Sequence, residues 1–234
     1  MSLISDNLQA VLDDIRATEL RFDRPSKSVR LLAVSKTFGA EAILEAAQHG
    51  QTAFGENYLQ EALEKMTLIQ SNSPELHLEW HFIGPIQSNK TKPIAEHFDW
   101  VHSVDREKIA ARLSEQRPAT MADLNICLQV NISGEESKSG VAPEDVVALA
   151  LRIATLPRIR LRGLMAVPEP TSDVAQQRQA FRHLRELGDK IVAQGISLDT
   201  LSMGMSSDLH AAIAEGSTMV RIGTGIFGSR NYAK

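Results

Sequence analysis

Short apolar segments typical of β-strands recur eight times along this chain, and segments with helical spacing lie between them. The expected strands cover residues 31–36, 53–57, 79–84, 100–104, 124–132, 160–167, 200–205 and 219–224. The expected helices cover residues 4–18, 40–49, 58–70, 89–97, 106–116, 143–156, 173–194 and 207–215. A helix between two strands returns the chain to the same edge of a sheet. The alternation therefore predicts an α/β fold with a parallel sheet.

Eight is also the number of strands that closes a (β/α)8 TIM barrel, here with an extra helix at residues 4–18 before the first strand. A doubly wound open sheet is the alternative. The strand-helix unit recurs without a break in composition that would mark a second domain. We therefore expect a single barrel domain over residues 1–234.

Composition excludes several classes of protein. With 43% hydrophobic and 23% charged residues, the chain has the composition of a globular protein. It lacks an apolar run of about 18 residues, so no membrane span is expected. The amino terminus does not resemble a signal peptide, and Cys127 is the only cysteine, which together favour the cytoplasm. The net charge of −4 gives no overall reason to expect nucleic-acid binding.

Lys36 closes the first apolar strand, residues 31–36, immediately before a turn. Ligands of barrels and open α/β sheets bind at the carboxyl ends of the strands. A lysine at this place is therefore a candidate functional amine. The alternative is a lysine whose ammonium group simply reaches solvent at the end of a strand.

Two segments near the carboxyl terminus are typical of a phosphate-binding site. Ser206 and Ser207 are expected at the amino terminus of the helix that follows the seventh strand, where backbone N–H groups and the helix dipole favour an anion. Gly223 and Thr224 follow the eighth strand and offer close backbone approach and a hydroxyl. Separately, these are a helix cap and a glycine-rich turn. Together they lie after strands seven and eight, where barrels frequently bind phosphate.

A phosphate site beside a lysine points to pyridoxal 5′-phosphate (PLP), whose aldehyde forms an imine with lysine. In a closed barrel the first and eighth strands are neighbours, so Lys36 is expected to face the phosphate site across the mouth. An ordinary lysine has a pKa near 10.4, and burial with a nearby cation lowers it. Arg221 is the expected cation. The alternative for Arg221 is an ion-paired residue of the barrel wall.

Five ordered motifs resemble the YggS/PROSC family of PLP homeostasis proteins, whose fold is like that of the amino-terminal domain of alanine racemase (fold type III). The motifs are Ala33-Val34-Ser35-Lys36, Phe54-Gly55-Glu56-Asn57, Trp80-His81-Phe82-Ile83-Gly84, Gly204-Met205-Ser206-Ser207-Asp208 and Arg221-Ile222-Gly223-Thr224-Gly225-Ile226-Phe227-Gly228. The resemblance covers essentially the whole chain.

The resemblance also implies roles for individual residues. Lys36 is implied to carry PLP as a Schiff base, and Arg221 to face the pyridine nitrogen. The phosphate is implied to be held by Ser206, Ser207, Gly223 and Thr224, and the ring to be lined by Asn57, Ile83 and Met165. No metal site is expected, because the closest pair of histidines, His77 and His81, falls at the entrance of a strand.

Racemisation provides a test of whether such a protein is an enzyme, because it needs two bases on opposite faces of the substrate. In alanine racemase the second base is a tyrosine of a separate domain. The sequence ends ten residues after Thr224, and neither Tyr58 nor Tyr232 matches that position. We therefore expect a monomeric carrier in PLP (vitamin B6) homeostasis, with indirect effects on amino-acid and keto-acid pools. Its expected partners are PLP, other B6 vitamers and apo forms of PLP-dependent enzymes.

Two alternatives remain open on the sequence alone. One is a PLP enzyme of narrow scope, such as a weak amino-acid racemase. The other is a phosphate-ligand or nucleic-acid module in which Lys36 acts only through its charge.

Overall fold

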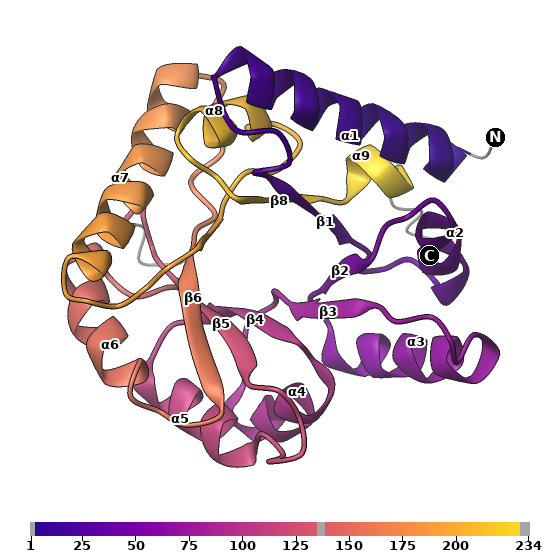
Figure 1. Ribbon diagram of the computed structural model, residues 1–234, viewed down its shortest axis with the longest axis horizontal. Helices are drawn as coiled ribbons and strands as arrows, with labels where there is room; N and C mark the ends of the chain where they lie inside the picture. Colours follow the sequence, from indigo (N-terminus) through magenta and orange to yellow (C-terminus); the bar gives the residue numbers. More distant parts are fainter. Residues whose placement is uncertain (1–2, 135–138, 230–234) are drawn as a thin grey trace.

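Eight parallel strands close into a barrel with helices around it (Figure 1). The computed structural model describes residues 3–134 and 139–229. Each strand pairs with the next in chain order, and β8 pairs with β1. The strands are β1 Arg30–Val34, β2 Ala53–Glu56, β3 Glu79–Phe82, β4 Trp100–Val104, β5 Leu124–Gln129, β6 Ile159–Met165, β7 Thr200–Ser202 and β8 Met219–Ile222. The predicted barrel is confirmed, and the open sheet was the wrong alternative.

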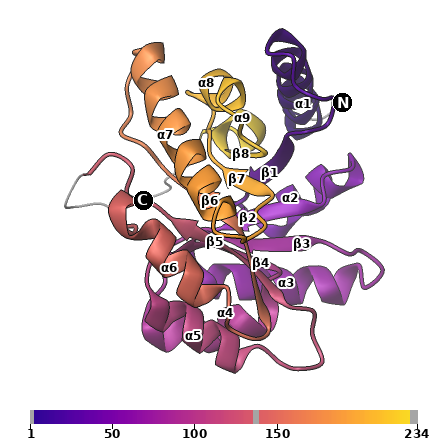
Figure 2. The ribbon, with the colours of Figure 1, turned by 60° about the vertical axis from the view of Figure 1, so that its left-hand side comes forward.

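The helices cover the outer face of the barrel. They are α1 Leu3–Arg21, α2 Ala40–Gln48, α3 Leu59–Asn72, α4 Thr91–His97, α5 Glu107–Gln116, α6 Val146–Ile153, α7 Val174–Val192, α8 Leu209–Ala214 and α9 Thr224–Phe227. The extra helix α1 lies across the outside of β8 and contacts both α8 and α9 (Figure 1). From the side, α8 is seen between α7 and α1 (Figure 2). The amino-terminal helix thus covers the place where the barrel closes.

All strands except β4 end one to three residues earlier than the sequence pattern predicts. The patterns of the first three strands extend to residues 36, 57 and 84, whereas the strands end at Val34, Glu56 and Phe82. The patterns of the last four extend to residues 132, 167, 205 and 224, whereas the strands end at Gln129, Met165, Ser202 and Ile222. The residues beyond these ends are mostly apolar or small, and Val130, Ala166 and Met203 still donate a backbone hydrogen bond to the neighbouring strand. Several of them line a cavity at this end of the barrel, which explains why hydrophobicity alone does not mark the ends of the strands.

Two local features differ from the expected helices. Pro143 lies in a 3₁₀ turn, Pro143–Asp145, and α6 begins only at Val146. The glycine-rich segment after β8, expected as a turn, contains the four-residue helix α9.

The main hydrophobic core lies between the strands and the surrounding helices. Ile43, Phe98 and Leu113 of the helical layer are fully buried there, as is Phe54 of β2. Parallel strands are covered on both faces, which accounts for their nearly continuous apolar runs. The barrel interior is different, since small apolar clusters alternate with the buried polar side chains of His81, His102 and Ser202.

Cys127 of β5 is fully buried, and burial raises the pKa of its thiol to about 12. Such a thiol is unreactive at neutral pH. Within residues 3–134 and 139–229, no helix is both long and apolar enough to cross a membrane.

Candidate functional site

A cavity of about 460 Å³ lies at the carboxyl ends of the strands. Its volume is in the range of small-molecule sites. Its wall is formed by residues at the carboxyl ends of β1, β6 and β8 and by the segments that follow β1, β2, β3, β6, β7 and β8. They are Val34, Lys36, Phe38, Asn57, Ile83, Met165, Val167, Met205, Ser206, Ser207, Arg221, Gly223 and Thr224. The structure therefore brings together all nine residues that the sequence suggested as a site.

Four lining residues were not predicted: Val34, Phe38, Val167 and Met205. The pleat of a strand places residues two apart on the same face, so the parity of Val34 with Lys36 was a usable signal. Phe38 packs on the ring of Phe227, with ring centroids 5.1 Å apart. Val167 and Met205 are the last residues of two expected strands, and Met205 also belongs to one of the predicted motifs, so their place at the carboxyl ends of strands was a usable signal.

Lys36 is half-buried in the turn that follows β1. Backbone hydrogen bonds fix this turn, because the N–H of Ser35 donates to the carbonyl of Gly55 at 3.0 Å. The N–H of Phe38 donates back to the carbonyl of Ser35 at 3.1 Å. The lysine is thus presented from a rigid turn whose neighbours are bonded to the barrel.

A buried ion pair beneath this turn was not predicted. Lys65 of α3 donates to Oε1 of Glu56 at 2.7 Å and to the carbonyl of Ser35 at 2.9 Å. The hydroxyl of Ser35 donates to the same Oε1 at 2.6 Å. Glu56 is fully buried, and burial raises its pKa, against the lowering effect of Lys65. A charged residue at the end of a buried strand was the available signal.

The next residue of the turn adds a second tie to α3. Thr37 has a φ of 69°, in the left-handed region that a β-branched residue rarely adopts. Its N–H donates to Oε1 of Glu61 at 2.6 Å, and Glu61 also pairs with Lys65. Strain of this kind persists only where the surrounding contacts hold it. The turn that carries Lys36 is therefore held on both sides.

Ser206 and Ser207 lie in a turn between β7 and α8. The carboxylate of Asp208 accepts the N–H of Met205 at 2.6 Å and so closes this turn. The helix α8 has only six residues and begins at Leu209. Ser206 and Ser207 therefore stand just before the first turn of this helix, at its amino terminus, as predicted from the sequence. It is the preceding turn that presents them.

The loop after β8 lies against the serine turn. A Cβ built on Gly225 would lie 3.5 Å from Oγ of Ser206, and one built on Gly223 would lie 3.2 Å from the carbonyl of Val34. Within residues 3–134 and 139–229, the N–H groups and hydroxyls of Ser206, Ser207 and Thr224 have no hydrogen-bond partner, nor has the N–H of Gly223. These donors converge on one edge of the cavity, which is suited to an anion.

Arg221 of β8 is buried in the cavity wall. Its guanidinium donates to the carbonyl and hydroxyl of Ser202 at 2.6 and 2.8 Å and to the carbonyl of Ala166 at 2.9 Å. Burial lowers its pKa to about 10, with Asp208 acting in the opposite direction. Its partners in the described chain are neutral acceptors, so the expected alternative of an ion-paired wall residue was wrong. Three bonds leave two of its five N–H groups available.

Asn57, Ile83 and Met165 complete the wall from β2, β3 and β6. Oδ1 of Asn57 is buried, and none of the described residues donates to it. Gly84 allows the two loops to approach, because a Cβ there would lie 2.8 Å from Cα of Asn57. Met165 is 2% exposed and gives the cavity an apolar face.

The arrangement combines a primary amine, an edge of hydrogen-bond donors and a buried donor-only cation. Among the described lining residues, Lys36 carries the only side chain with an ordinary acid-base function in water, since arginine stays protonated. The cavity can therefore hold a small anionic molecule and react with its carbonyl group through the amine.

Comparison with known proteins identifies relatives of the whole chain. A profile of the family described as "Alanine racemase, N-terminal domain" matches residues 7–231. The chain is 60% identical over 232 residues to a pyridoxal phosphate homeostasis protein of Pseudomonas aeruginosa, covering 99% of this chain and 98% of that one.

Solved structures agree with this relationship. PipY of Synechococcus elongatus, solved with PLP bound, is 37% identical with a TM-score of 0.81, covering 96% of this chain and all of that chain. Alanine racemase from Corynebacterium glutamicum has a TM-score of 0.71 at 17% identity, which shows the fold alone. The alignment covers 99% of the present chain and 61% of the racemase.

Proposed function

This chain belongs to the alanine racemase N-terminal domain family and, within it, to the pyridoxal phosphate homeostasis proteins, and we propose that it binds PLP through Lys36 and acts as a carrier of this cofactor. The observation that carries the proposal is that Lys36, Arg221 and the donor-rich loops after β7 and β8 line one cavity. Effects on amino-acid and keto-acid pools then follow indirectly from the supply of PLP.

The residues of the cavity fit this cofactor. A phosphate group is an acceptor of several hydrogen bonds, and the loops with Ser206 and Thr224 offer donors that lack partners in the described chain. A pyridine nitrogen is an acceptor, and Arg221 has donors to spare. Oδ1 of Asn57 is a buried acceptor without a donor, so it is suited to a hydroxyl group of the ring.

Each group of residues has a separate task in this proposal. When bound, PLP supplies an aldehyde that forms a reversible Schiff base with a primary amine. Lys36 provides that amine from its fixed turn. Ser206, Ser207, Gly223 and Thr224 hold the phosphate, while Arg221 donates toward the ring nitrogen and keeps a proton from it. Ile83 and Met165 exclude water from the faces of the ring.

The proposal is tested by reconstituting the purified protein with PLP. We expect a visible absorbance band of the Schiff base in the wild type and its loss in Lys36→Ala. Borohydride reduction followed by peptide mass spectrometry should locate the cofactor on Lys36. Lys92→Ala is the matched control, because Lys92 is an exposed lysine on α4. A band that survives in Lys36→Ala would exclude the proposed attachment.

Removal of single site residues then separates binding from charge effects. Arg221→Ala should weaken PLP retention and shift the visible band, because the ring nitrogen loses its donor. If PLP were held only by surface charge, Lys92→Ala would reduce binding as much as Lys36→Ala. That outcome would favour the alternative of a general phosphate-binding module.

We further propose that the protein has no robust catalytic activity. Racemisation needs a second base, and the described part of the cavity wall offers Lys36 but no tyrosine, histidine, cysteine or carboxylate. Tyr58 is half exposed and outside the wall, and Tyr232 lies outside the described residues. The second candidate function is a weak amino-acid racemase, favoured by the shared fold with alanine racemase.

Chiral chromatography decides between carrier and enzyme. The PLP-loaded protein is incubated with a panel of L-amino acids for hours, with alanine racemase as a positive control. We expect no D-enantiomer above a protein-free PLP control. Turnover that disappears in Lys36→Ala would identify an enzyme and overturn the carrier proposal.

The remaining parts of the proposal concern the setting of the protein. We infer that it is a cytoplasmic monomer that exchanges PLP and other B6 vitamers and delivers PLP to apo-enzymes. Light scattering of the loaded protein measures the oligomeric state. Transfer to an apo-enzyme in the presence of a trap for free PLP measures direct delivery, which a complete block by the trap would exclude.

A further inference from the structure

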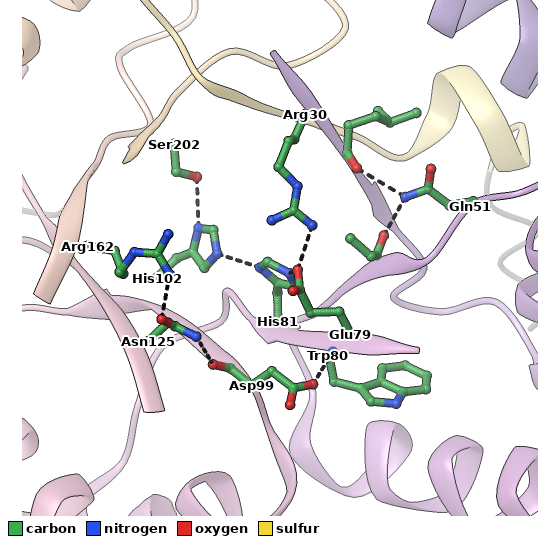
Figure 3. Close-up of polar contacts among 12 residues, drawn as sticks. Arg30, Gln51, Glu79, Trp80, His81, Asp99, His102, Asn125, Arg162 and Ser202 are labelled. Atoms are coloured by element: carbon green, nitrogen blue, oxygen red, sulfur yellow. Dashed lines mark hydrogen bonds and ion pairs between the residues drawn. The ribbon is translucent and has the colours of Figure 1, made fainter. Parts of the chain in front are cut away.

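A continuous chain of hydrogen bonds crosses the barrel interior from the cavity to the opposite end. Figure 3 shows its middle part, in which the imidazole of His102 lies between Ser202 and the imidazole of His81. The residues lie on five different strands, β1, β3, β4, β7 and β8. In order from the cavity the members are Arg221, Ser202, His102, His81, Glu79 and Arg30.

At the end far from the cavity, the series of hydrogen bonds finishes at the carboxylate of Glu79, which can accept but cannot donate. Oε1 of Glu79 lies 2.6 Å from Nε2 of His81, and Arg30 donates to the same oxygen at 2.8 Å. The pKa of Glu79 is lowered to about 2, with His81 and Arg30 outweighing the effect of burial, so this carboxyl is ionised at neutral pH. The proton of His81 must therefore sit on Nε2.

At the cavity, the series of hydrogen bonds begins at the guanidinium of Arg221, which can donate but cannot accept. The guanidinium of Arg221 donates to the hydroxyl of Ser202 at 2.8 Å. Ser202 then has its own hydrogen for Nδ1 of His102, which lies 2.8 Å away. In this arrangement His102 accepts at Nδ1 and carries its proton on Nε2.

The tautomers required of His81 and His102 are compatible where the two rings meet. Nε2 of His102 and Nδ1 of His81 are 2.8 Å apart, and the first must donate to the second. Every hydrogen bond of the chain thus runs in one direction, from the cation at the cavity toward the carboxylate at the far end. A chain ordered in this way is polarised, and each bond strengthens the next.

Burial keeps the two imidazoles neutral, as this order requires. Both are completely buried, and burial lowers the pKa of each. His81 faces Glu79, Arg30 and Asp99, and stacks on the ring of Trp100 at a centroid distance of 5.4 Å. His102 faces His81 and the cations Arg221 and Arg30, which lower its pKa further. A second proton on His81 would place its Nδ1–H against the Nε2–H of His102, so that two donors would face each other.

We propose that Glu79, His81, His102 and Ser202 are positioning residues that hold Arg221 toward the bound ring through one polarised hydrogen-bond chain. The inference rests on the proposed function and names residues that never touch the ligand. The proposal predicts that a substitution of Glu79, at the far end of the barrel, changes the visible band or the dissociation constant of PLP bound in the cavity. A polar barrel core that serves only stability predicts no such effect.

The direction of the hydrogen bonds is tested first, in the protein without PLP. Long-range ¹H–¹⁵N NMR of the apo-protein distinguishes the two neutral tautomers and the charged form of each histidine. We expect both His81 and His102 as neutral Nε2–H tautomers at pH 7. A charged ring or an Nδ1–H tautomer at either residue overturns the proposal.

The transmission is tested with variants of the loaded protein. His102→Phe removes both ring nitrogens, and we expect the dissociation constant of PLP to rise about tenfold, as for loss of one hydrogen bond to a charged group. The visible band of bound PLP should shift as well. His102→Gln keeps one acceptor and one donor and should restore most of both properties.

Glu79→Gln is the more demanding variant, because this residue is partly exposed and far from the cavity. An amide no longer dictates one tautomer, so the NMR spectrum should show a mixture at His81 and the PLP band should shift. Glu107→Gln, which breaks the exposed pair between Glu107 and Arg152, is the matched control.

The outcomes separate the inference from the proposed function. If the wild type fails to bind PLP, the function is wrong, while the apo-protein spectrum still decides the order of the chain. If the wild type binds PLP but both His102→Phe and Glu79→Gln leave the band and the dissociation constant unchanged, the positioning role is refuted and the carrier stands.

Discussion

The buried pair of Glu56 and Lys65 offers the sharpest test of how the turn that carries Lys36 is held. Lys65→Met removes the ammonium group and keeps most of the volume of the side chain. Glu56 then retains only the hydroxyl of Ser35, since its second oxygen has no partner among the described residues. Breaking one side of a buried pair costs about 3–5 kcal/mol.

A loss of this size is measurable in a chain of 234 residues. It corresponds to a fall in the melting temperature of roughly 10 °C for a protein of this length. Lys92→Met is the control, because Lys92 and Glu96 form an exposed pair at 3.8 Å. Such pairs contribute at most about 1 kcal/mol.

The pH dependence separates a lost ion pair from a lost packing contact. Burial already raises the pKa of Glu56, and loss of Lys65 raises it further. The folded variant then binds a proton more tightly than the unfolded chain, whose glutamate has a pKa of about 4.3. The variant is therefore most stable at low pH and loses stability as the pH rises through the folded pKa, by up to about 1.4 kcal/mol per pH unit.

Urea unfolding of the wild type, Lys65→Met and Lys92→Met between pH 5 and pH 8 measures this difference. We expect the gap between wild type and Lys65→Met to widen with pH, and Glu56→Gln in the same chain to recover most of the loss. A gap that does not change with pH, or a cost no greater than that of Lys92→Met, would refute the reasoning.

Three other predictions follow from the geometry. Ser207→Ala should raise the dissociation constant of PLP about tenfold and leave that of pyridoxal, which lacks the phosphate, unchanged; equal losses for both ligands would contradict the phosphate assignment. Gly204→Ala should lower the free energy of unfolding by about 1–3 kcal/mol more than Gly50→Ala does. Both glycines have positive φ, but only at Gly204 would the new Cβ meet another atom, Cβ of Ala212 at 2.6 Å. Equal losses in urea unfolding would refute this contact. The wild type should be more stable than Glu79→Gln at neutral pH, and this difference in the free energy of unfolding should shrink as the pH falls from about 4 toward 2. The reason is that a lowered carboxyl pKa gives stability that is lost on protonation. A difference that does not change with pH would contradict this prediction.

The architecture could be predicted from the sequence because it depends on local periodicity repeated eight times. The same pattern placed Lys36 at the carboxyl end of the barrel, although β1 ends at Val34 and Lys36 lies two residues further on, in the turn. The exact ends of β1 to β3 and of β5 to β8 could not be predicted, because the apolar pattern continues into segments that line the cavity. Hydrophobicity marks burial, and burial at this end of the barrel extends past the last regularly paired residues.

The polar contacts across the barrel interior could not be predicted from local sequence patterns. His102 and Ser202 are 100 residues apart in sequence, and His81 and His102 are 21 apart. Their contact depends on the pairing of distant strands in a closed sheet, for which no local signal exists. His81 was weighed only for its spacing from His77, and the structure instead places it against Glu79 and His102.

The contacts of Arg221 and the make-up of the cavity wall support the proposed carrier role over the alternative of an enzyme. At the cavity, Arg221 donates without accepting, and its bonds to Ser202 tie it to the chain that leads away from the ligand. A ring nitrogen facing such a donor stays unprotonated, which makes the ring a weaker sink for electrons. The described wall offers Lys36 but no second base. If the protein is the carrier proposed above, the property to measure is the rate at which PLP leaves the site and not a rate of substrate turnover.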